Sequence, residues 1–264
     1  TTYTASVRQS YLQPLFKLLG LPILPNYIDG QVKIKTRFDQ KNELTFIGLA
    51  GFDNMKSNLE PDDKGDEYLL SYLPKLKQET FTVGMSYKHF GGQHIQNAVL
   101  SYSYLNNRNI KYMQNDESAA ENLNLKSSGL EGKAQARFEN RSYYGAWTVR
   151  EGGEMNFRHY DSNVWRRLTV GENMDYSSKL AFVSWGIFTS ADYKSPAGKV
   201  NASMGLRVDG SSFSRRTAQF WKQLSPRASL SYMPWKNWSF NASAGLYHQL
   251  PPVTALSFRD ASGT

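Results

Sequence analysis

A chain of 264 residues with no cysteine, 40% hydrophobic residues and a net charge of +8 falls outside several classes of protein. The lack of cysteine argues against a disulfide-stabilised secreted domain, and the basic residues are spread singly rather than in blocks that bind nucleic acid. The mean hydropathy of -0.56 is low, and no stretch approaches the ~20 apolar residues of a spanning helix. The protein is therefore either soluble or crosses a membrane as a β-barrel.

In chain order, residues 11–29 come first. Leu15, Phe16, Leu18 and Leu19 recur at helical spacing, which predicts either a short amphipathic helix over a barrel rim or a hydrophobic loop cluster. From residue 30 onwards, apolar and polar residues alternate, which predicts strands with two faces of different polarity. We expect antiparallel strands at 30–39, 43–54, 79–90, 94–105, 127–140, 144–159, 176–193, 198–209, 225–234 and 237–249.

The apolar face of these strands is rich in small residues. In 131–139, Gly132, Ala134, Ala136 and Phe138 alternate with charged residues and one glutamine. A soluble core gains from large side chains, whereas a surface that faces lipid tolerates small ones. We expect the following residues to face lipid: Val200, Ala202, Met204, Leu206, Phe240, Ala242, Ala244 and Leu246.

Strand length and connection length separate a barrel from a soluble sandwich. Several expected strands reach the ~9–11 residues of a tilted spanning strand, whereas the mean soluble strand has ~5–6. The connections alternate between short turns, such as 39–42, and long polar segments at 54–78, 106–124, 160–175 and 209–224. Outer-membrane barrels pair short periplasmic turns with long extracellular loops. The sequence therefore predicts an all-β fold, an antiparallel transmembrane barrel, and no enzyme.

The polar face carries charges in the middle of the strands. Candidate lumen-lining residues are Lys133, Arg137, Arg150, Glu154, Arg158, Arg207, Arg227, Tyr247 and Gln249. One interpretation is a hydrated wall braced by cross-strand pairs, and the other is a positive lumen that favours anionic cargo. Because Arg207 and Arg227 would lie close together, we expect them to share an acidic partner, either Asp209 or a carboxylate from outside the chain.

The sequence contains no recognisable motif for catalysis or for metal binding. The four histidines lack zinc spacing and there is no cysteine to join them. Asp62, Asp63, Asp66 and Glu67 form an acidic cluster without the EF-hand spacing, so a solvated loop is the simpler interpretation than a Ca²⁺ site. No phosphate-binding loop or nucleophile motif is present. We therefore predict no catalytic residues, no metal and no cofactor.

The segment 205–256 resembles the barrel of TonB-dependent outer-membrane transporters. The matching elements are Gly205-Leu206-Arg207 with Asp209, then Ser225-Pro226-Arg227, then Gly245-Leu246-Tyr247 with Gln249 and Pro251. Segments 11–35 and 152–161 are also similar to the family, in a form like that of the Bacteroidetes. Each motif is short, and their order and spacing carry the resemblance.

The resemblance implies a 22-stranded barrel with a plugged lumen. Residues 1–264 would then be part of one barrel domain, about half of it, and we expect the plug domain and the energy-coupling segment to lie N-terminal to it. The implied function is active uptake of a scarce nutrient such as a ferric siderophore, haem, cobalamin, a glycan or a peptide. The implied partners are outer-membrane lipid, the TonB complex through the N-terminal part, the nutrient ligand and, in some members, a surface lipoprotein. Alternatives are a passive porin or adhesin barrel and a soluble β-sandwich carbohydrate-binding module.

Overall fold

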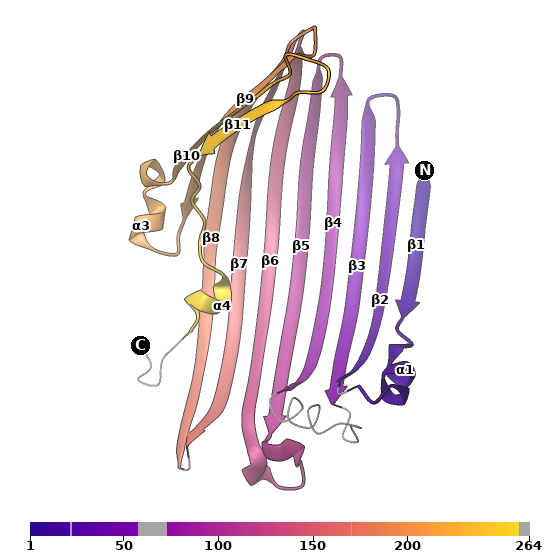
Figure 1. Cartoon of the computed structure of the whole chain (residues 1–264), viewed down its shortest axis with the longest axis vertical. Coiled ribbons are helices and arrows are strands. Elements are labelled where there is room, and N and C mark those ends of the chain that lie inside the picture. Colours follow the sequence, from indigo (N-terminus) through magenta and orange to yellow (C-terminus); the bar gives the residue numbers. More distant parts are fainter. Residues whose placement is uncertain (22, 58–72, 170, 259–264) are drawn as a thin grey trace.

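The computed structural model describes residues 1–21, 23–57, 73–169 and 171–258. These residues form one antiparallel sheet in which each strand pairs only with its neighbours in sequence, so that β1 and β11 lie at the two open edges (Figure 1). The strands are β1 (Thr2–Gln9), β2 (Ile23–Arg37), β3 (Asn42–Ser57), β4 (Lys75–Gly91), β5 (His94–Tyr112), β6 (Leu123–Tyr144), β7 (Trp147–Thr169), β8 (Glu172–Lys194), β9 (Val200–Ser211), β10 (Leu224–Tyr232) and β11 (Phe240–Gly245).

Short helices lie in the connections at one end of the sheet and after the last strand. They are α1 (Leu12–Leu18), η1 (Met113–Asn115), η2 (Ala120–Asn122), α3 (Arg215–Ala218), η3 (Phe220–Lys222) and α4 (Val253–Leu256). In Figure 1, the short turns lie at the top, and α1 lies at the bottom beside the ends of β1 and β2. Within the described residues, no helix has the length and apolar character that crossing a membrane would require.

The two faces of the sheet differ in polarity, as the alternation predicts. Met204 pairs with Ala228, which pairs with Ala244, and Ala202 pairs with Leu230. Directly paired residues point to the same side of a sheet, so the predicted set from Val200 to Leu206 and from Phe240 to Ala244 shares one face. We call this side the apolar face. That it contacts lipid remains a prediction.

The sheet buries almost no hydrophobic core. Its accessible surface is 17531 Å², against roughly 11,700 Å² for a compact protein of this mass. Among the described residues only Leu24, Phe182, Phe188 and Val253 are buried apolar side chains. Large apolar side chains such as Ile187, at 63% exposed, lie open on the apolar face. A single sheet of this kind needs a non-aqueous environment for that face.

Aromatic side chains mark both borders of the apolar face. At the end with short turns, Trp147 packs on Tyr193 with ring centroids 4.9 Å apart, and towards the other end Phe81 stacks on Tyr104 at 4.9 Å. On β8 the distance from Trp185 to Tyr193 is eight residues, or ~27 Å along the strand and ~21 Å along the membrane normal at a tilt of ~40°. Such a spacing is close to the ~25 Å height of the apolar band between the two aromatic girdles of a transmembrane barrel.

A side-chain cap fixes the first short turn. The Asp39 carboxylate accepts hydrogen bonds from the backbone N of Lys41 at 2.6 Å and of Asn42 at 2.8 Å, and from Asn42 Nδ2 at 2.7 Å. These bonds, that from the Asn42 side chain first, lower the pKa of Asp39 below its usual value. Such Asx caps let a chain reverse within a few residues.

The first two strands differ from the predicted ones. Strand β1 was not predicted, although the amino acids Tyr3, Ala5 and Val7 do alternate with polar residues. Of the two interpretations of residues 11–29, the structure has a helix over Leu12–Leu18, but β2 already begins at Ile23, so residues 23–29 are strand and belong to neither interpretation. Pro25 is tolerated there because β1 pairs with β2 only from Ile28 onwards, which leaves one side of Pro25 without a partner strand.

The predicted long loop at 160–175 is wrong. Strand β7 runs to Thr169 and β8 starts at Glu172, which gives a hairpin of two 23-residue strands. Strands β4, β5 and β6 also extend beyond their predicted ends, while β11 stops at Gly245 instead of residue 249. Where the strands extend past the apolar band, both faces mix polar and apolar residues and the alternation that predicts a strand is lost. The acidic cluster at 62–67 lies outside the described residues.

Candidate functional site

The polar face gathers seven of the predicted site residues. Lys133 lies directly opposite Arg158, and Arg137 directly opposite Glu154. Strand β8 connects this face to β9, because Phe188 pairs with both Gly152 and Arg207. Arg150 lies on the same face of β7, and Arg227 on the same face of β10. The structure therefore brings together on one side: Lys133, Arg137, Arg150, Glu154, Arg158, Arg207 and Arg227.

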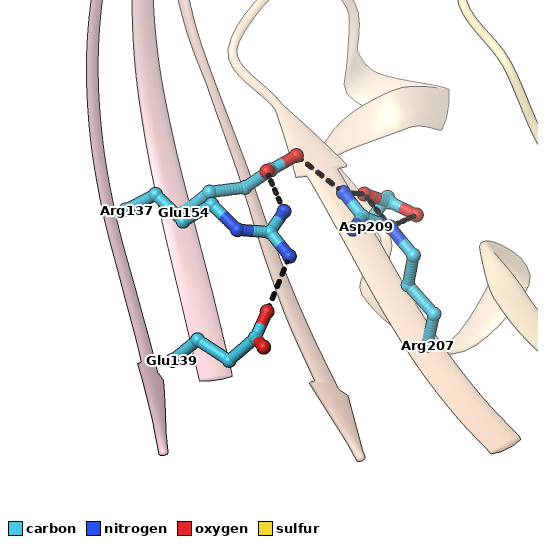
Figure 2. A network of polar contacts seen from close by, with 5 residues as sticks. All are labelled: Arg137, Glu139, Glu154, Arg207 and Asp209. Atoms are coloured by element: carbon cyan, nitrogen blue, oxygen red, sulfur yellow. Dashed lines mark hydrogen bonds and ion pairs between the residues drawn. The ribbon is translucent and has the colours of Figure 1, made fainter. Parts of the chain in front are cut away.

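A continuous arginine–carboxylate network crosses this face (Figure 2). Glu154 is its centre: Oε2 accepts from Arg137 Nη1 at 2.9 Å, and Oε1 accepts from Arg207 Nη2 at 2.7 Å. Arg207 also donates from Nε and Nη2 to Asp209, at 2.9 and 2.7 Å. On the other side, Arg137 donates to Glu139 at 3.0 Å. The network therefore ties β6, β7 and β9 together across β8.

Glycine residues make room for the network. A Cβ at Gly186 would lie 2.5 Å from Arg207 Nη2 and 2.6 Å from Asp209 Oδ1. A Cβ at Gly152 would lie 2.6 Å from the Phe188 ring and 2.5 Å from a backbone oxygen of β6. The buried Phe188 ring in turn lies 4.7 Å from the Arg137 guanidinium carbon, a cation–π contact. The small residues of β7 and β8 thus let long side chains lie flat across the sheet.

The network is neutral. Arg141 also pairs with Glu139, at 3.2 Å, so its arginines, at 137, 141 and 207, match its carboxylates, at 139, 154 and 209, in number. Glu154 is 15% exposed, whereas Arg137 is 35% exposed. Charges shielded by each other contribute little field at a distance. For Arg137 and Arg207, the structure therefore favours the bracing interpretation over that of a positive lumen.

Two further pairs lie on the polar face. Arg150 pairs with Asp192 across β7 and β8. Nearer the short turns, the almost fully buried Glu43 accepts from Lys35 Nζ at 2.9 Å and lies 3.4 Å from Arg37 Nη2. These ion pairs could not be predicted from a sequence motif. Each joins residues of two different strands, and the pairing depends on a strand register that the sequence alone does not give.

Arg227 behaves differently from Arg207. The expected acidic partner Asp209 binds Arg207, but no described residue forms an ion pair with Arg227. The prediction that Asp209 is shared is therefore wrong, whereas the alternative, a carboxylate from outside the chain, stays a prediction. Arg227 lies between Gly205 and Gly245, and a Cβ at Gly205 would come within 2.8 Å of Arg227 Nε. The side chain lies across β9, at a small recess that Tyr247 also lines.

Like Arg227, the neighbouring residues Lys133 and Arg158 form no ion pair with a described residue. Arg158 lines a cavity of about 240 Å³, and its buried Nε has no hydrogen-bond acceptor. Asn156, which is only 6% exposed, lines the same cavity and its Oδ1 accepts no hydrogen bond. One donor and one acceptor without partners are therefore buried in the wall of this cavity.

The segment that follows β11 also lines this cavity. His248 and Gln249 contribute to its wall, although both lie after the end of the strand in which they were predicted. His248 Nδ1 lies 3.3 Å from Ser225 Oγ. Further along, Phe258 contacts Tyr176 of the polar face, with ring centroids 6.4 Å apart. Asn156 was not among the predicted residues, because an isolated asparagine in a strand carries no signal of burial.

The fold and the polar face define a class of protein: one wall of a transmembrane β-barrel of the outer-membrane type, apolar on one side and charged on the other. Residues 24–264 match the family model described as "TonB dependent receptor-like, beta-barrel". The chain belongs to this family, whose members are receptors and transporters of the Gram-negative outer membrane. No curated protein sequence matches the chain.

Solved structures share the fold at low sequence identity. The chain is similar to the ferripyoverdine receptor of the outer membrane of Pseudomonas aeruginosa, with a TM-score of 0.61 and 12% identity over 90% of this chain and 36% of that one. It is similar to the ferric enterobactin receptor of Pseudomonas aeruginosa, with a TM-score of 0.61 and 14% identity over 87% and 34%. It is also similar to the copper transporter OprC, with a TM-score of 0.56 and 13% identity over 92% and 36%. The chain spans about a third of the length of these proteins.

Proposed function

We propose that this chain is part of the barrel of an outer-membrane transporter that takes up a scarce nutrient at the expense of energy supplied by the TonB complex. The observation that carries the proposal is the two-faced, 11-stranded antiparallel sheet, together with its family match. In this proposal the apolar face contacts outer-membrane lipid and the polar face lines the lumen. The TonB complex would act through another part of the protein, and a surface lipoprotein is a further proposed partner.

The ion-paired and the free basic residues have different proposed roles. The network around Glu154 braces the lumen wall, because each of its charges is already matched. Lys133, Arg158 and Arg227 have no such partner in the described chain, so they remain free to bind a carboxylate, a phenolate or a phosphate. Arg158 and Asn156 line the same cavity, and each has a buried polar atom without a hydrogen-bond partner in its wall. No chemical step on the bound ligand is proposed.

Transport can be tested in cells that carry or lack the complete gene. Growth would be compared on a single limiting source, in turn a ferric siderophore, haem, cobalamin, a glycan and a peptide. The proposal expects that one of these sources supports growth only with the gene and only when TonB is present. Uptake that persists without TonB, or growth that is the same with and without the gene on every source, would contradict it.

A conductance measurement separates this proposal from a passive porin. The complete protein would be inserted into a planar lipid bilayer at a fixed voltage. A barrel whose lumen is plugged gives no steady open-channel current, whereas a porin of similar size conducts ions continuously. A stable, large conductance would favour the passive barrel.

A further inference from the structure

Three basic side chains gather on the apolar side of the sheet, beyond its aromatic border. Lys77 of β4 lies directly opposite Arg108 of β5, and Arg108 lies directly opposite Ser128 of β6. Lys126 lies two residues further along β6, on the same face. All three are exposed. Alternation places them on the side that carries Phe81 and Tyr104, not on the side of the arginine–carboxylate network.

These charges have no counterion within the described chain. No described residue forms an ion pair with Lys77, Arg108 or Lys126. Two like charges directly opposite each other destabilise a sheet. Glu79 is the nearest acid on this face, and it accepts from Asn106 Nδ2 at 3.4 Å. The cluster therefore keeps a net positive charge.

An apolar furrow runs along β6 on the same face. In one row Leu100 pairs with Ala136, which pairs with Met155. Each alanine lies between larger side chains of β5 and β7, and the next row, through Ala134, repeats the arrangement. The result is a concavity of about 610 Å³. Towards the basic cluster, the ring of His159 lies over Gly132 and borders the furrow.

The dimensions fit one leaflet of a membrane. Lys77 and Arg108 lie four residues beyond Phe81 and Tyr104, which is ~13 Å along the strands or ~10 Å along the membrane normal at a tilt of ~40°. Long basic side chains at this height reach the headgroup layer. Ala136 in the furrow lies eight residues from Ser128, or ~20 Å along the normal, of which ~10 Å lies beyond the aromatic border and ~10 Å within the apolar band, less than the ~15 Å half-thickness of the hydrocarbon core.

We propose that this surface binds one phosphorylated lipid of the outward-facing leaflet, with the phosphate at Lys77, Arg108 and Lys126 and an acyl chain in the furrow along β6. The inference rests on the membrane orientation in the proposed function, but not on transport. Guanidinium and ammonium groups are the usual ligands of phosphate. Charge complementarity and an apolar furrow further along the same strand together select an anionic amphiphile over a neutral lipid or a free anion.

The test counts lipids on the complete protein by native mass spectrometry in a neutral detergent. The protein would be titrated with phosphatidylglycerol or with phosphatidylcholine of the same acyl chains. At about 1 kcal/mol for each basic residue near a charged surface, the K77Q/R108Q variant should lose about 10- to 30-fold in affinity for phosphatidylglycerol and keep its affinity for phosphatidylcholine. The matched control is K199Q/K236Q, which removes two exposed charges from the short turns at the other end.

A second variant tests the furrow. A134L/A136L fills it with residues that suit the apolar face, and should weaken phosphatidylglycerol binding without changing the gel mobility of the folded barrel. Three results would overturn the proposal: no preference of the unaltered protein for phosphatidylglycerol, an equal loss in K199Q/K236Q, or displacement of the lipid by an equal concentration of inorganic phosphate. Because the readout is bound lipid, loss of nutrient uptake would bear on the proposed function alone.

Discussion

Replacing Glu154 by glutamine should weaken the barrel by about 2 kcal/mol. Both carboxylate oxygens are used, at 2.9 Å to Arg137 and 2.7 Å to Arg207, and the side chain is 15% exposed. Breaking a buried pair costs ~3–5 kcal/mol, whereas an exposed pair contributes ~0–1 kcal/mol. The two arginines are 35% and 28% exposed and keep their other carboxylates, so the expected cost lies between these limits.

The assay is guanidinium unfolding of the complete protein in detergent micelles, followed by tryptophan fluorescence. The E154Q variant should unfold at a lower midpoint with an unchanged slope. The control is E121Q, because Glu121 is exposed in the connection before β6 and forms no ion pair with a described residue. A double-mutant cycle with R207Q isolates the pair. An equal midpoint shift in E121Q, or no coupling between positions 154 and 207, would refute the bracing role.

Three further perturbations test the facing, the packing and the turns. M204R should cost ~2–4 kcal/mol if the position lies near the bilayer midplane, while S203R on the polar face should assemble normally, as judged by heat-modifiable gel mobility. G152A should lower stability by ~1–3 kcal/mol through the clash with Phe188 and the β6 backbone, whereas G153A, with 3.5 Å to its nearest neighbour, should not. Because the pKa of Asp39 is lowered on folding, the stability it adds is present above pH ~4 and lost as pH falls through the folded value. D39N should remove this acid-dependent loss below pH ~4, and a similar loss in the variant would contradict the cap.

Much of the fold could be predicted because the two faces of this sheet differ in polarity, so that apolar and polar residues alternate along each strand. The alternation in 131–139 and 199–208 places every residue on its correct side, and the register confirms it. The prediction failed where the environment no longer differs between the faces. In 160–169 and 172–175 both sides mix polar and apolar residues without alternation, so that a strand and a loop have similar sequences there.

The polar face was predicted as a set, but its pairing was not. Arg207 and Asp209 lie two residues apart on one strand, so their ion pair follows from local spacing alone. The bond from Arg207 to Glu154 joins positions 53 residues apart, and depends on how β7, β8 and β9 align. Arg227 shows the same limit: sequence proximity predicted a partner that the structure gives to Arg207.

The most direct test of the barrel assignment is a scan of side-chain environment along β9. The chain has no cysteine, so a single cysteine introduced at each of positions 200–208 is the only labelling site within it. Each variant of the complete protein would carry a spin label at that cysteine and be reconstituted in lipid bilayers. We predict that collision with oxygen, which concentrates in lipid, is high at even positions such as 204 and 206. Collision with a water-soluble nickel complex should be high or intermediate at odd positions such as 203. Accessibility to oxygen that does not alternate, or that alternates in the opposite phase, would contradict the account.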